Sequence, residues 1–381
     1  MTPGPHEDAQ LGLFDMGDKH SSVMHPDELH AETARVRYIG SKARIVDAIL
    51  EVIGPPGNDD GFFVDAFAGT GVVGAKAGEL GWPIRLNDHL LSSVVTSAAR
   101  LLGSETVLFS RFGGYLQAVA ALNNVRPRHG FLWREYSPAS LEAIGIERRY
   151  FTEDNAAKLD AMRARIEEWT AEGSLTRDER ILLIADLLSA ANAVANIAGT
   201  YGCFMRKWLD SALRPVMVKP RRLRAKSGSV EVYNVDVEAV PISTNDVAYF
   251  DPPYTKRQYA AYYHILETIA HGDEPQVGGI TGLRPWHEKA SAFCYKTRAL
   301  EAISSMLAKT PSRRIYLSYS SEGHVTRDAL ERTLATLGRV TFHEIGHVGR
   351  YRPNQAASDN ASQVSEFLVE LEKAVIIEAA A

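Results

Sequence analysis

The sequence predicts an α/β fold in which one sheet is interrupted by a mostly helical insertion. Two observations lead to this prediction. Short apolar segments bounded by Gly, Pro, Asn and Asp occur before residue 90 and again after residue 229, as expected for buried strands. A glycine-rich turn follows the first of these segments and leads into a helical pattern, which is how a βαβ unit begins.

The amino-terminal part of the sheet is expected to follow a helix. Four apolar residues of segment 42–53 lie on one helical face, and the Gly, Pro, Asn and Asp residues of 54–61 predict a loop. Buried strands are expected at 62–67 and 83–88. A helix that ends near Gly81 is expected between them, so strand, helix and strand would form a βαβ unit.

Helical patterns dominate the chain from about 90 to 229, for example at 155–171 and 179–199. Short apolar segments then return, and they predict strands at 229–236, 246–251, 313–320, 339–348 and 365–371. An insertion of this size between two strands of one sheet is expected to form a separate recognition or lid domain.

We therefore divide the chain into three parts. The sheet domain comprises 35–100 plus 229–372, and the helical insertion comprises 101–228. Residues 1–34 are polar and rich in His, Asp and Pro, so we expect them to form a poorly ordered arm.

The composition limits the classes of function. Of 381 residues, 45% are hydrophobic and 23% are charged, as in a globular protein with a sizeable core. The formal net charge is −5, so a nucleic-acid partner would require a local basic surface. Two cysteines, Cys203 and Cys294, exclude a disulfide framework and a cysteine-built zinc site, and they suit the reducing cytoplasm, where we expect the protein. No apolar run reaches the length of a membrane span, and the acidic amino terminus does not resemble a signal peptide, so we expect no membrane partner.

The glycine-rich turn is VDAFAGTGVVG, in which Gly69, Gly71 and Gly74 have the spacing G-x-G-x-x-G. Glycines let a backbone approach a ligand closely. Asp88, about 20 residues further on at the next strand end, can accept hydrogen bonds from both ribose hydroxyls. The pattern therefore favours a nucleoside-containing cofactor over a plain tight turn.

The acid before this turn bears on the kind of cofactor. Asp65 lies four residues before Gly69, where its charge would repel the pyrophosphate of NAD or FAD. An acid at this place suits a ligand that carries positive charge, such as the sulfonium and ammonium groups of S-adenosylmethionine. The sequence thus favours S-adenosylmethionine over a dinucleotide.

A second motif, Asp251-Pro252-Pro253-Tyr254, follows the apolar run VAYF and is therefore expected at the carboxyl end of a strand. The Asp251 carboxylate and the Pro252 carbonyl can each accept one N–H of an exocyclic base amine, which makes the amine lone pair available. The prolines fix φ and remove competing donors. Tyr254 offers a flat face for an unstacked base. The alternative is a proline-terminated strand with a packed tyrosine.

Together these motifs resemble the Dam-like, or alpha-group, DNA adenine-N6 methyltransferases over about residues 35–370. The segments that carry the resemblance are RYIGSK (37–42), DAFAGTG (65–71), ND (87–88) and YFDPPYTKRQY (249–259), with weaker likeness in RYFTEDNAAKLDAMR (149–163), ANIAGTYGCFMRKW (195–208) and HILETIA (264–270).

The resemblance implies a Rossmann-like class I methyltransferase sheet with a helical target-recognition insertion. The sheet domain is then the catalytic domain. The implied reaction transfers a methyl group from S-adenosylmethionine to the N6 amine of a flipped adenine in double-stranded DNA, with Asp251, Pro252, Pro253 and Tyr254 as catalytic residues. A restriction endonuclease acting at the same site would be a separate chain.

The resemblance also implies the cofactor contacts. Tyr38 and Lys42 would contact the methionine end, Asp88 would hold the ribose, and Asp236 would lie beside the adenine ring. The methionine end would also be cradled by Asp65 and by the turn Phe67, Ala68, Gly69, Thr70 and Gly71, with Asp251 nearby. Tyr38 stands where some relatives carry Trp. Without the resemblance, Lys42 would be interpreted as a solvated lysine at the start of helix 42–53.

One local basic segment, RKWLDSALRPVMVKPRRLRAK (206–226), holds eight Lys or Arg residues and one Asp. Such a cluster is typical of phosphate contacts, although a solvated loop is the alternative. The expected DNA-binding residues are Arg206, Lys207, Lys219, Arg221, Arg222 and Arg224, together with Lys256 and Arg257 just after the second motif. Arg148 and Arg149 are further candidates.

His264, Glu267 and His271 have near-helical spacing, but we interpret them as core or surface residues and expect no metal. Three other functions remain open. Cytosine-N4 methylation uses the same chemistry, but its usual S-P-P-Y motif would place Ser at position 251. A nucleotide-dependent oxidoreductase would leave the Asp251 motif unexplained, and a non-catalytic DNA-binding module would not need it.

Overall fold

The computed structural model describes residues 38–348 and 364–373, and all of them belong to one compact unit. The arm expected at 1–34 lies outside the described residues. Among the described residues, no helix combines the length and apolarity that a membrane span requires.

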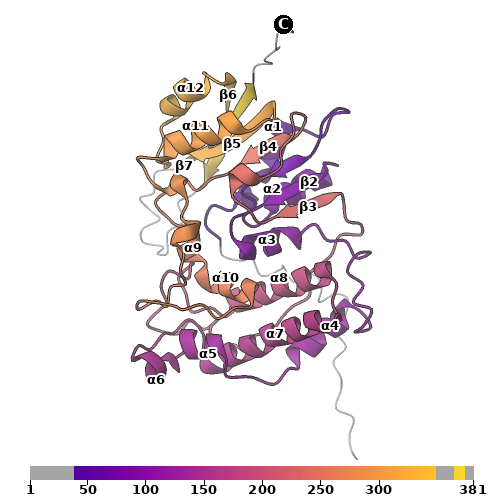
Figure 1. Cartoon of the computed structure of the whole chain (residues 1–381), viewed down its shortest axis with the longest axis vertical. Helices are drawn as coiled ribbons and strands as arrows, with labels where there is room; N and C mark the ends of the chain where they lie inside the picture. Colours follow the sequence, from indigo (N-terminus) through magenta and orange to yellow (C-terminus); the bar gives the residue numbers. More distant parts are fainter. Residues whose placement is uncertain (1–37, 349–363, 374–381) are drawn as a thin grey trace, which may run out of the picture. The chain divides into compact units, whose positions relative to one another are not determined.

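A seven-stranded sheet runs through the unit in the order β3-β2-β1-β4-β5-β7-β6 (Figure 1). Its strands are β1 (Phe63–Asp65), β2 (Ile84–Asn87), β3 (Val230–Tyr233), β4 (Val247–Phe250), β5 (Arg314–Ser320), β6 (Gly338–Val348) and β7 (Val364–Lys373). The first five pair in parallel, whereas β7 lies antiparallel between β5 and β6. Every strand expected from the sequence is present.

The sheet has a helical layer on each face. Strand β4 shows the alternation: Val247 and Tyr249 join a core with helices α1 and α2, whereas Ala248 and Phe250 join a core with α11 and α12. These helices are α1 (Val46–Ile53), α2 (Val72–Glu79), α11 (Ala299–Lys309) and α12 (Arg327–Leu334). The helix expected at 42–53 is divided, because a separate 3₁₀ turn at Lys42–Arg44 precedes α1.

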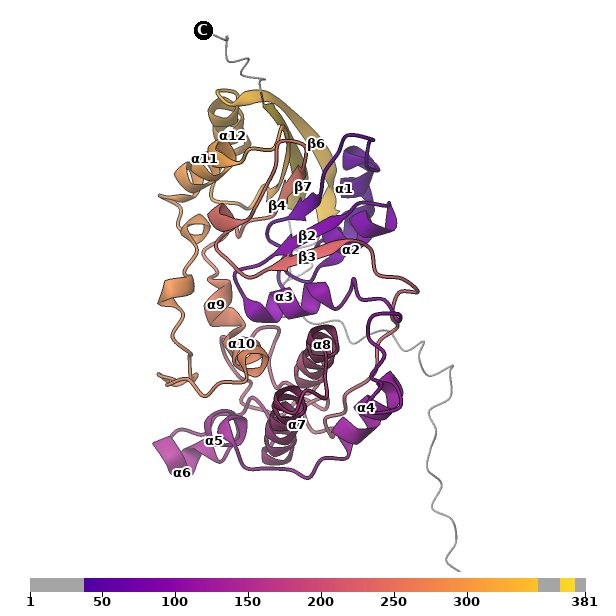
Figure 2. The ribbon, with the colours of Figure 1, turned by 45° about the vertical axis from the view of Figure 1, so that its right-hand side comes forward.

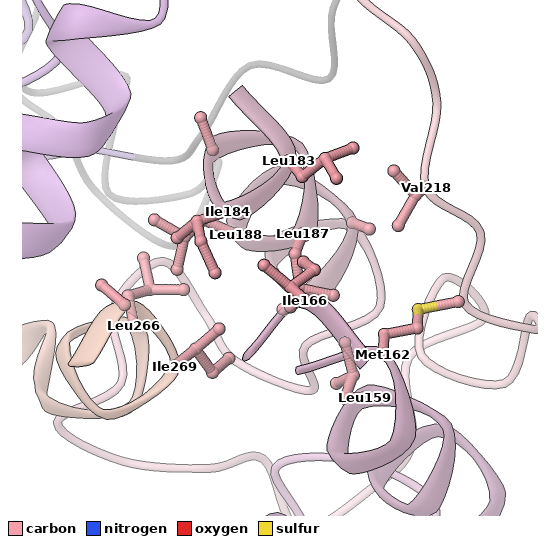
Figure 3. Packing of buried hydrophobic residues seen from close by; sticks show 14 of the residues in the cluster. Leu159, Met162, Ile166, Leu183, Ile184, Leu187, Leu188, Val218, Leu266 and Ile269 are labelled. Carbon is pink, nitrogen blue, oxygen red and sulfur yellow. The ribbon is translucent and has the colours of Figure 1, made fainter. Parts of the chain in front are cut away.

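Besides the two cores on the faces of the sheet, a third core lies in the insertion and is formed almost entirely by helices. It contains α4 (Tyr115–Asn123), α5 (Phe131–Tyr136), α6 (Ser140–Ile144), α7 (Glu153–Ala171) and α8 (Arg177–Ala193). Side chains of α7 and α8 interdigitate in its centre (Figure 3). Two helices from outside the insertion, α3 (Leu91–Ala98) and α10 (His264–His271), complete this core. The boundary between sheet domain and insertion is therefore less sharp than a division at 101 and 228.

Helix α3 is the element that connects the two regions. It contacts β2 and β3 on one side and α8 on the other, so it lies between sheet and helical layer (Figure 2). The short helix α9 (Tyr259–Tyr262) precedes α10 in the segment that follows β4. Residues after β4 thus return from the sheet edge to the helical layer.

The helical prediction for the end of the insertion is wrong. The helix expected at 179–199 ends at Ala193, and 194–229, all of which is described, forms turns and loops with no regular helix or strand. Asn196 organises this segment, because its side chain donates to the carbonyls of Arg149 and Met205 and accepts from the Leu209 N–H. Asn side chains of this kind replace helical hydrogen bonds with local ones.

Candidate active site

The carboxyl ends of β1, β2 and β4 meet at one edge of the sheet, where a cavity of about 760 Å³ opens. That is the edge at which parallel α/β sheets bind ligands. The cavity is lined by thirteen residues expected from the sequence: Tyr38, Lys42, Asp65, Phe67, Ala68, Gly69, Thr70, Asp88, Asp236, Asp251, Pro252, Pro253 and Tyr254. The structure therefore brings both motifs and the amino-terminal Tyr38 segment to one place.

The turn requires glycine at its three glycine positions, because of backbone conformation or because other atoms of the protein lie too close for a side chain. Gly69 and Gly71 have φ of +52° and +73°, which other residues rarely adopt. A Cβ at Gly71 would lie 2.5 Å from Ser97 Cα, and one at Gly74 would lie 2.7 Å from the Leu86 side chain. Gly71 does not line the cavity itself; it directs the chain into helix α2.

Asp65 ends β1 beneath this turn. Its Oδ2 accepts the Gly74 N–H at 3.0 Å, whereas its buried Oδ1 has no hydrogen-bond partner among the described residues. Burial raises the pKa of this carboxyl to about 7, against the hydrogen bond from Gly74. A ligand ammonium group would supply the missing donor.

Asp88, after β2, connects the second strand to the glycine turn. Its two oxygens accept the Gly69 and Leu90 N–H groups, each at 2.9 Å. Burial raises the pKa of Asp88 to about 6 even though both hydrogen bonds favour the ionised form. Each oxygen keeps a further lone pair, so the group can still accept from hydroxyls at the cavity.

Asp236 and an apolar slot form another part of the wall. Asp236 accepts the Glu238 N–H at 3.0 Å and begins a 3₁₀ turn, Val237–Ala239. Phe67 packs edge-on against Phe293, and both line the cavity near Met306. A polar acceptor beside an aromatic slot is suited to a flat heterocycle.

The second motif is held by an unexpected charge cluster. Lys42 Nζ lies 2.9 Å from Asp251 Oδ1 and 3.7 Å from Glu366 Oε2, and the lysine is only 5% exposed. Burial alone would lower the pKa of Lys42, but the Asp251 and Glu366 carboxylates outweigh it and raise this pKa. The alternative of a solvated Lys42 is therefore wrong.

Tyr254 is fixed by the same cluster. Its hydroxyl donates to Glu366 Oε1 at 3.3 Å, and Lys42 Nζ lies 5.3 Å from its ring centroid. The ring also packs edge-on against Tyr319. The tyrosine is thus held at its hydroxyl and its ring.

Two tyrosines that the sequence patterns did not single out support Tyr38. The Tyr38 ring stacks on Tyr263 with centroids 4.7 Å apart, and the Tyr263 hydroxyl accepts the Ile39 N–H at 2.7 Å. Tyr259 donates to the Ile39 carbonyl at 3.2 Å. Their spacing of four at the start of a helix was a usable signal. For Glu366, the only signal was an acid at an inward position of an apolar strand.

Glu267 has a structural role that the sequence did not reveal. It accepts hydrogen bonds from the Ser92 N–H and hydroxyl, the Leu91 N–H and Lys289, and so connects α10 to the start of α3. Burial would raise its pKa, but His271, Lys289 and Ser92 outweigh this effect and lower it. His264 is buried with Nε2 at 3.0 Å from the Tyr201 carbonyl oxygen.

The basic residues expected to bind DNA fall into two groups. Five are exposed: Arg206, Lys207, Lys219, Arg222 and Lys256. Arg221 is buried with its Nε 2.7 Å from Asp186, which corrects its expected phosphate contact. Arg224 is partly buried and donates to the Ala75 carbonyl, and Arg257 is also partly buried. Arg148 is buried on Glu135, and Arg149 pairs with Glu147.

Comparison of the sequence with known proteins gives a family model and several relatives that it matches. Residues 38–332 match the family model of D12 class N6 adenine-specific DNA methyltransferases. The type II methyltransferase M.FokI of Planomicrobium okeanokoites is 32% identical over 349 residues, which cover 90% of this chain and 53% of that protein.

Two further relatives give a similar result. The type II methyltransferase M.NlaIII of Neisseria lactamica is 31% identical over 344 residues, 89% of this chain and 99% of that protein. The modification methylase LlaI of Lactococcus lactis subsp. lactis is 34% identical over 305 residues, 77% of this chain and 48% of that protein. The chain thus spans about half of M.FokI and LlaI, and nearly all of M.NlaIII.

Proposed function

Because the chain belongs to the family of D12 class N6 adenine-specific DNA methyltransferases, we propose that it transfers a methyl group from S-adenosylmethionine to the N6 amine of adenine in double-stranded DNA. The observation that carries this proposal is the shared cavity. The glycine turn and the Asp251 motif, 180 residues apart in the sequence, line the same hollow at the carboxyl edge of the sheet.

The acidic residues of the cavity support S-adenosylmethionine as the donor. This donor supplies a methyl group on positively charged sulfur. The unpaired Asp65 Oδ1 suits its ammonium group, Asp88 suits the ribose hydroxyls, and Asp236 with the aromatic slot suits the adenine ring. A dinucleotide pyrophosphate would lie against the Asp65 carboxylate, so the oxidoreductase alternative fits this site poorly.

Asp251 is suited to orient the accepting amine. Lys42 binds Oδ1, so the other oxygen can accept one N–H of N6 while the Pro252 carbonyl accepts the second. These hydrogen bonds make the lone pair of N6 available for attack. The ring of Tyr254, fixed by Glu366, offers a face to the base. Most of the rate enhancement then comes from alignment of the amine with the methyl group.

An adenine must leave the base stack to reach this cavity. The exposed basic residues Arg206, Lys207, Lys219, Arg222 and Lys256 suit contacts with the phosphate backbone, which supply most non-specific DNA affinity. The helical insertion is the part proposed to select the target sequence. We also propose a restriction endonuclease as a separate partner chain, since the relatives are named type II methyltransferases and modification methylases.

The test is transfer of labelled methyl from S-adenosylmethionine to genomic DNA, followed by digestion to nucleosides. We expect label in N6-methyladenosine with the wild type, and none above background with Asp251→Ala. Glu331→Ala, at an exposed carboxylate of α12, is the control and should match the wild type. Label in N4-methylcytosine would overturn the choice of base, and absence of label from DNA would overturn the proposal.

A further inference from the structure

Glu366 is a buried carboxylate with no assigned part in the reaction. It lies outside the residues matched by the family model and is 6% exposed. Strand β7 runs antiparallel to β5, with Glu366 opposite Ser320 at the carboxyl end of β5. The reversed direction of β7 therefore brings a residue from the beginning of this strand to the edge where the cavity opens.

Glu366 contacts the two groups that hold the second motif. Its Oε1 accepts from the Tyr254 hydroxyl at 3.3 Å, and its Oε2 lies 3.7 Å from Lys42 Nζ. Lys42 in turn lies 2.9 Å from Asp251. Glu366 does not line the cavity, so it acts behind the residues that do.

A purely structural role would not require this placement. Glu370 lies on the same face of β7, four residues on, where it accepts from the Tyr316 hydroxyl at 3.0 Å and contacts His343. It has the same side chain and a similar tyrosine partner, but within the described residues it forms no hydrogen bond or ion pair with Lys42 or the second motif. Burial of a carboxylate is unfavourable unless its partners compensate. The two acids therefore differ in the groups that they contact and in their burial, since Glu366 is buried and Glu370 is partly exposed.

The charges of the cluster suit the reaction. Two carboxylates, Asp251 and Glu366, surround the single ammonium of Lys42, so the ionised cluster carries one net negative charge. In methyl transfer the N6 lone pair forms the N–C bond as the C–S bond breaks, and the C–S electron pair stays on sulfur. Positive charge thus moves from sulfur to N6, which then releases one proton to water. A net negative cluster beside N6 stabilises this movement.

We propose that Glu366 is a positioning residue for methyl transfer: it holds Lys42 against Asp251, fixes the Tyr254 ring, and leaves the cluster with net negative charge. This inference rests on the proposed function. It extends the site to a residue more than one hundred positions after the second motif in the sequence.

The test compares Glu366→Gln with Glu370→Gln. Glutamine keeps the size and an acceptor for Tyr254 but removes the charge. We expect Glu366→Gln to lower kcat roughly ten- to a hundredfold while the KM for DNA changes by less than about twofold. Glu370→Gln should retain the wild-type kcat. Equal kcat values for the two variants and the wild type would overturn the inference.

A second readout needs neither DNA nor turnover. S-adenosylmethionine and S-adenosylhomocysteine differ by one methyl group and one positive charge, so the ratio of their affinities reports the charge near the methyl position. By calorimetry, we expect Glu366→Gln to reduce the preference for the charged ligand roughly three- to tenfold and Glu370→Gln to leave it unchanged. An unchanged ratio in Glu366→Gln would overturn the assignment of charge.

If Glu366→Gln does not fold, Tyr254→Phe tests the same link, because it removes only the hydroxyl that reaches Glu366. We expect a lower kcat with an unchanged affinity ratio; an unchanged kcat would overturn the role in fixing the ring. Failure of the wild type to form N6-methyladenosine would instead overturn the proposed function, whereas the affinity ratio would still test the cluster.

Discussion

At the scale of single residues, the site depends on charges removed from water. Lys42 is the buried cation that the buried Glu366 and the partly exposed Asp251 share, and Asp65 and Asp88 are acids whose pKa values burial raises. A buried charge without a partner is far less stable than one in water. We therefore expect each of these side chains to influence both the stability of the protein and its capacity to bind ligands.

Replacing Lys42 by methionine should destabilise the fold. The change leaves the buried Glu366 and the largely buried Asp251 without their cation, and breaking a buried ion pair in this way typically lowers the free energy of unfolding by about 3–5 kcal/mol. Urea denaturation measures the difference. Lys76→Met is the control, because its partner Asp47 is exposed, and it should have little effect. A similar small effect in both variants would contradict the role of Lys42.

Asp65 should make the stability of the ligand-free protein depend on pH. Its pKa in the fold is about 7, above the value of about 4 in the unfolded chain, so the folded state binds more protons between these values. Stability from this group is fully present below about pH 4 and is lost as pH rises through 7.

Asp65→Asn removes that contribution. Chemical denaturation at pH 5 and pH 7.5 should show that the wild type loses on the order of 2–4 kcal/mol more than the variant over this range. S-adenosylmethionine should reduce the loss in the wild type, since its ammonium group favours ionised Asp65. Equal pH dependence in both proteins would contradict the assignment.

At the scale of elements, the ends of strands and the turns after them decide where chemistry can occur. The glycine turn passes so close to Ser97 of α3 that no side chain fits at Gly71. Helix α10 joins α3 through Glu267, and Tyr259 and Tyr263 support the Tyr38 segment. The cavity walls are thus fixed by contacts between neighbouring elements rather than by any one loop.

The glycine turn permits a matched test. Gly71→Ala introduces a Cβ 2.5 Å from Ser97 Cα, whereas Gly173→Ala has the same left-handed backbone (φ +68°) with no atom within 4 Å. We expect Gly173→Ala to cost about 1 kcal/mol from backbone conformation alone. Gly71→Ala should cost clearly more and weaken binding of S-adenosylmethionine. Thermal unfolding measures the stability of each variant, and calorimetry measures its affinity for S-adenosylmethionine. Equal losses of stability in the two variants would contradict the close packing of the turn.

The sequence predicted every strand because each one is a short apolar run that ends in a turn or an acid, and these are local signals. It predicted the part of the cavity wall whose residues follow strands with carboxyl ends at one edge, but not the part formed by residues 288–306. Glu366 could not be predicted in this way. Its position depends on the direction of β7. That direction is determined by the pairing of β7 with β5, which no local sequence pattern reveals.

The insertion illustrates the same limit. Helices α7 and α8 were evident from periodicity, but 194–229 is organised by the side chain of Asn196, which bonds to residues distant in sequence. Arg221 and Arg222 are adjacent and look alike in the sequence. One is buried on Asp186 and the other is exposed, a difference that only the packing of α8 determines.

At the scale of the whole molecule, a net charge of −5 means that DNA affinity must come from local exposed cations. Arg221 and Arg222 allow DNA binding to be tested apart from a structural role, because the first is buried and the second is exposed. Arg222→Ala should weaken DNA binding and reduce the slope of log K against log salt by about 1. Arg221→Ala should leave the slope unchanged but lower stability by about 3–5 kcal/mol, because Asp186 loses its partner. Binding titrations at several salt concentrations measure the slope, and urea denaturation measures the stability. A reduced slope in Arg221→Ala, or a loss of stability in Arg222→Ala, would contradict these roles.

The reversed strand β7 also has a consequence for synthesis on the ribosome. Lys42 emerges before Asp251, but β6 has no neighbouring strand in the sheet until β7 has emerged to lie between it and β5. Since chains fold from the amino terminus as they are made, a nascent chain that already carries both motifs still lacks the second carboxylate of its charge cluster. The charge cluster is therefore completed only when residue 366 has been made and joins the sheet.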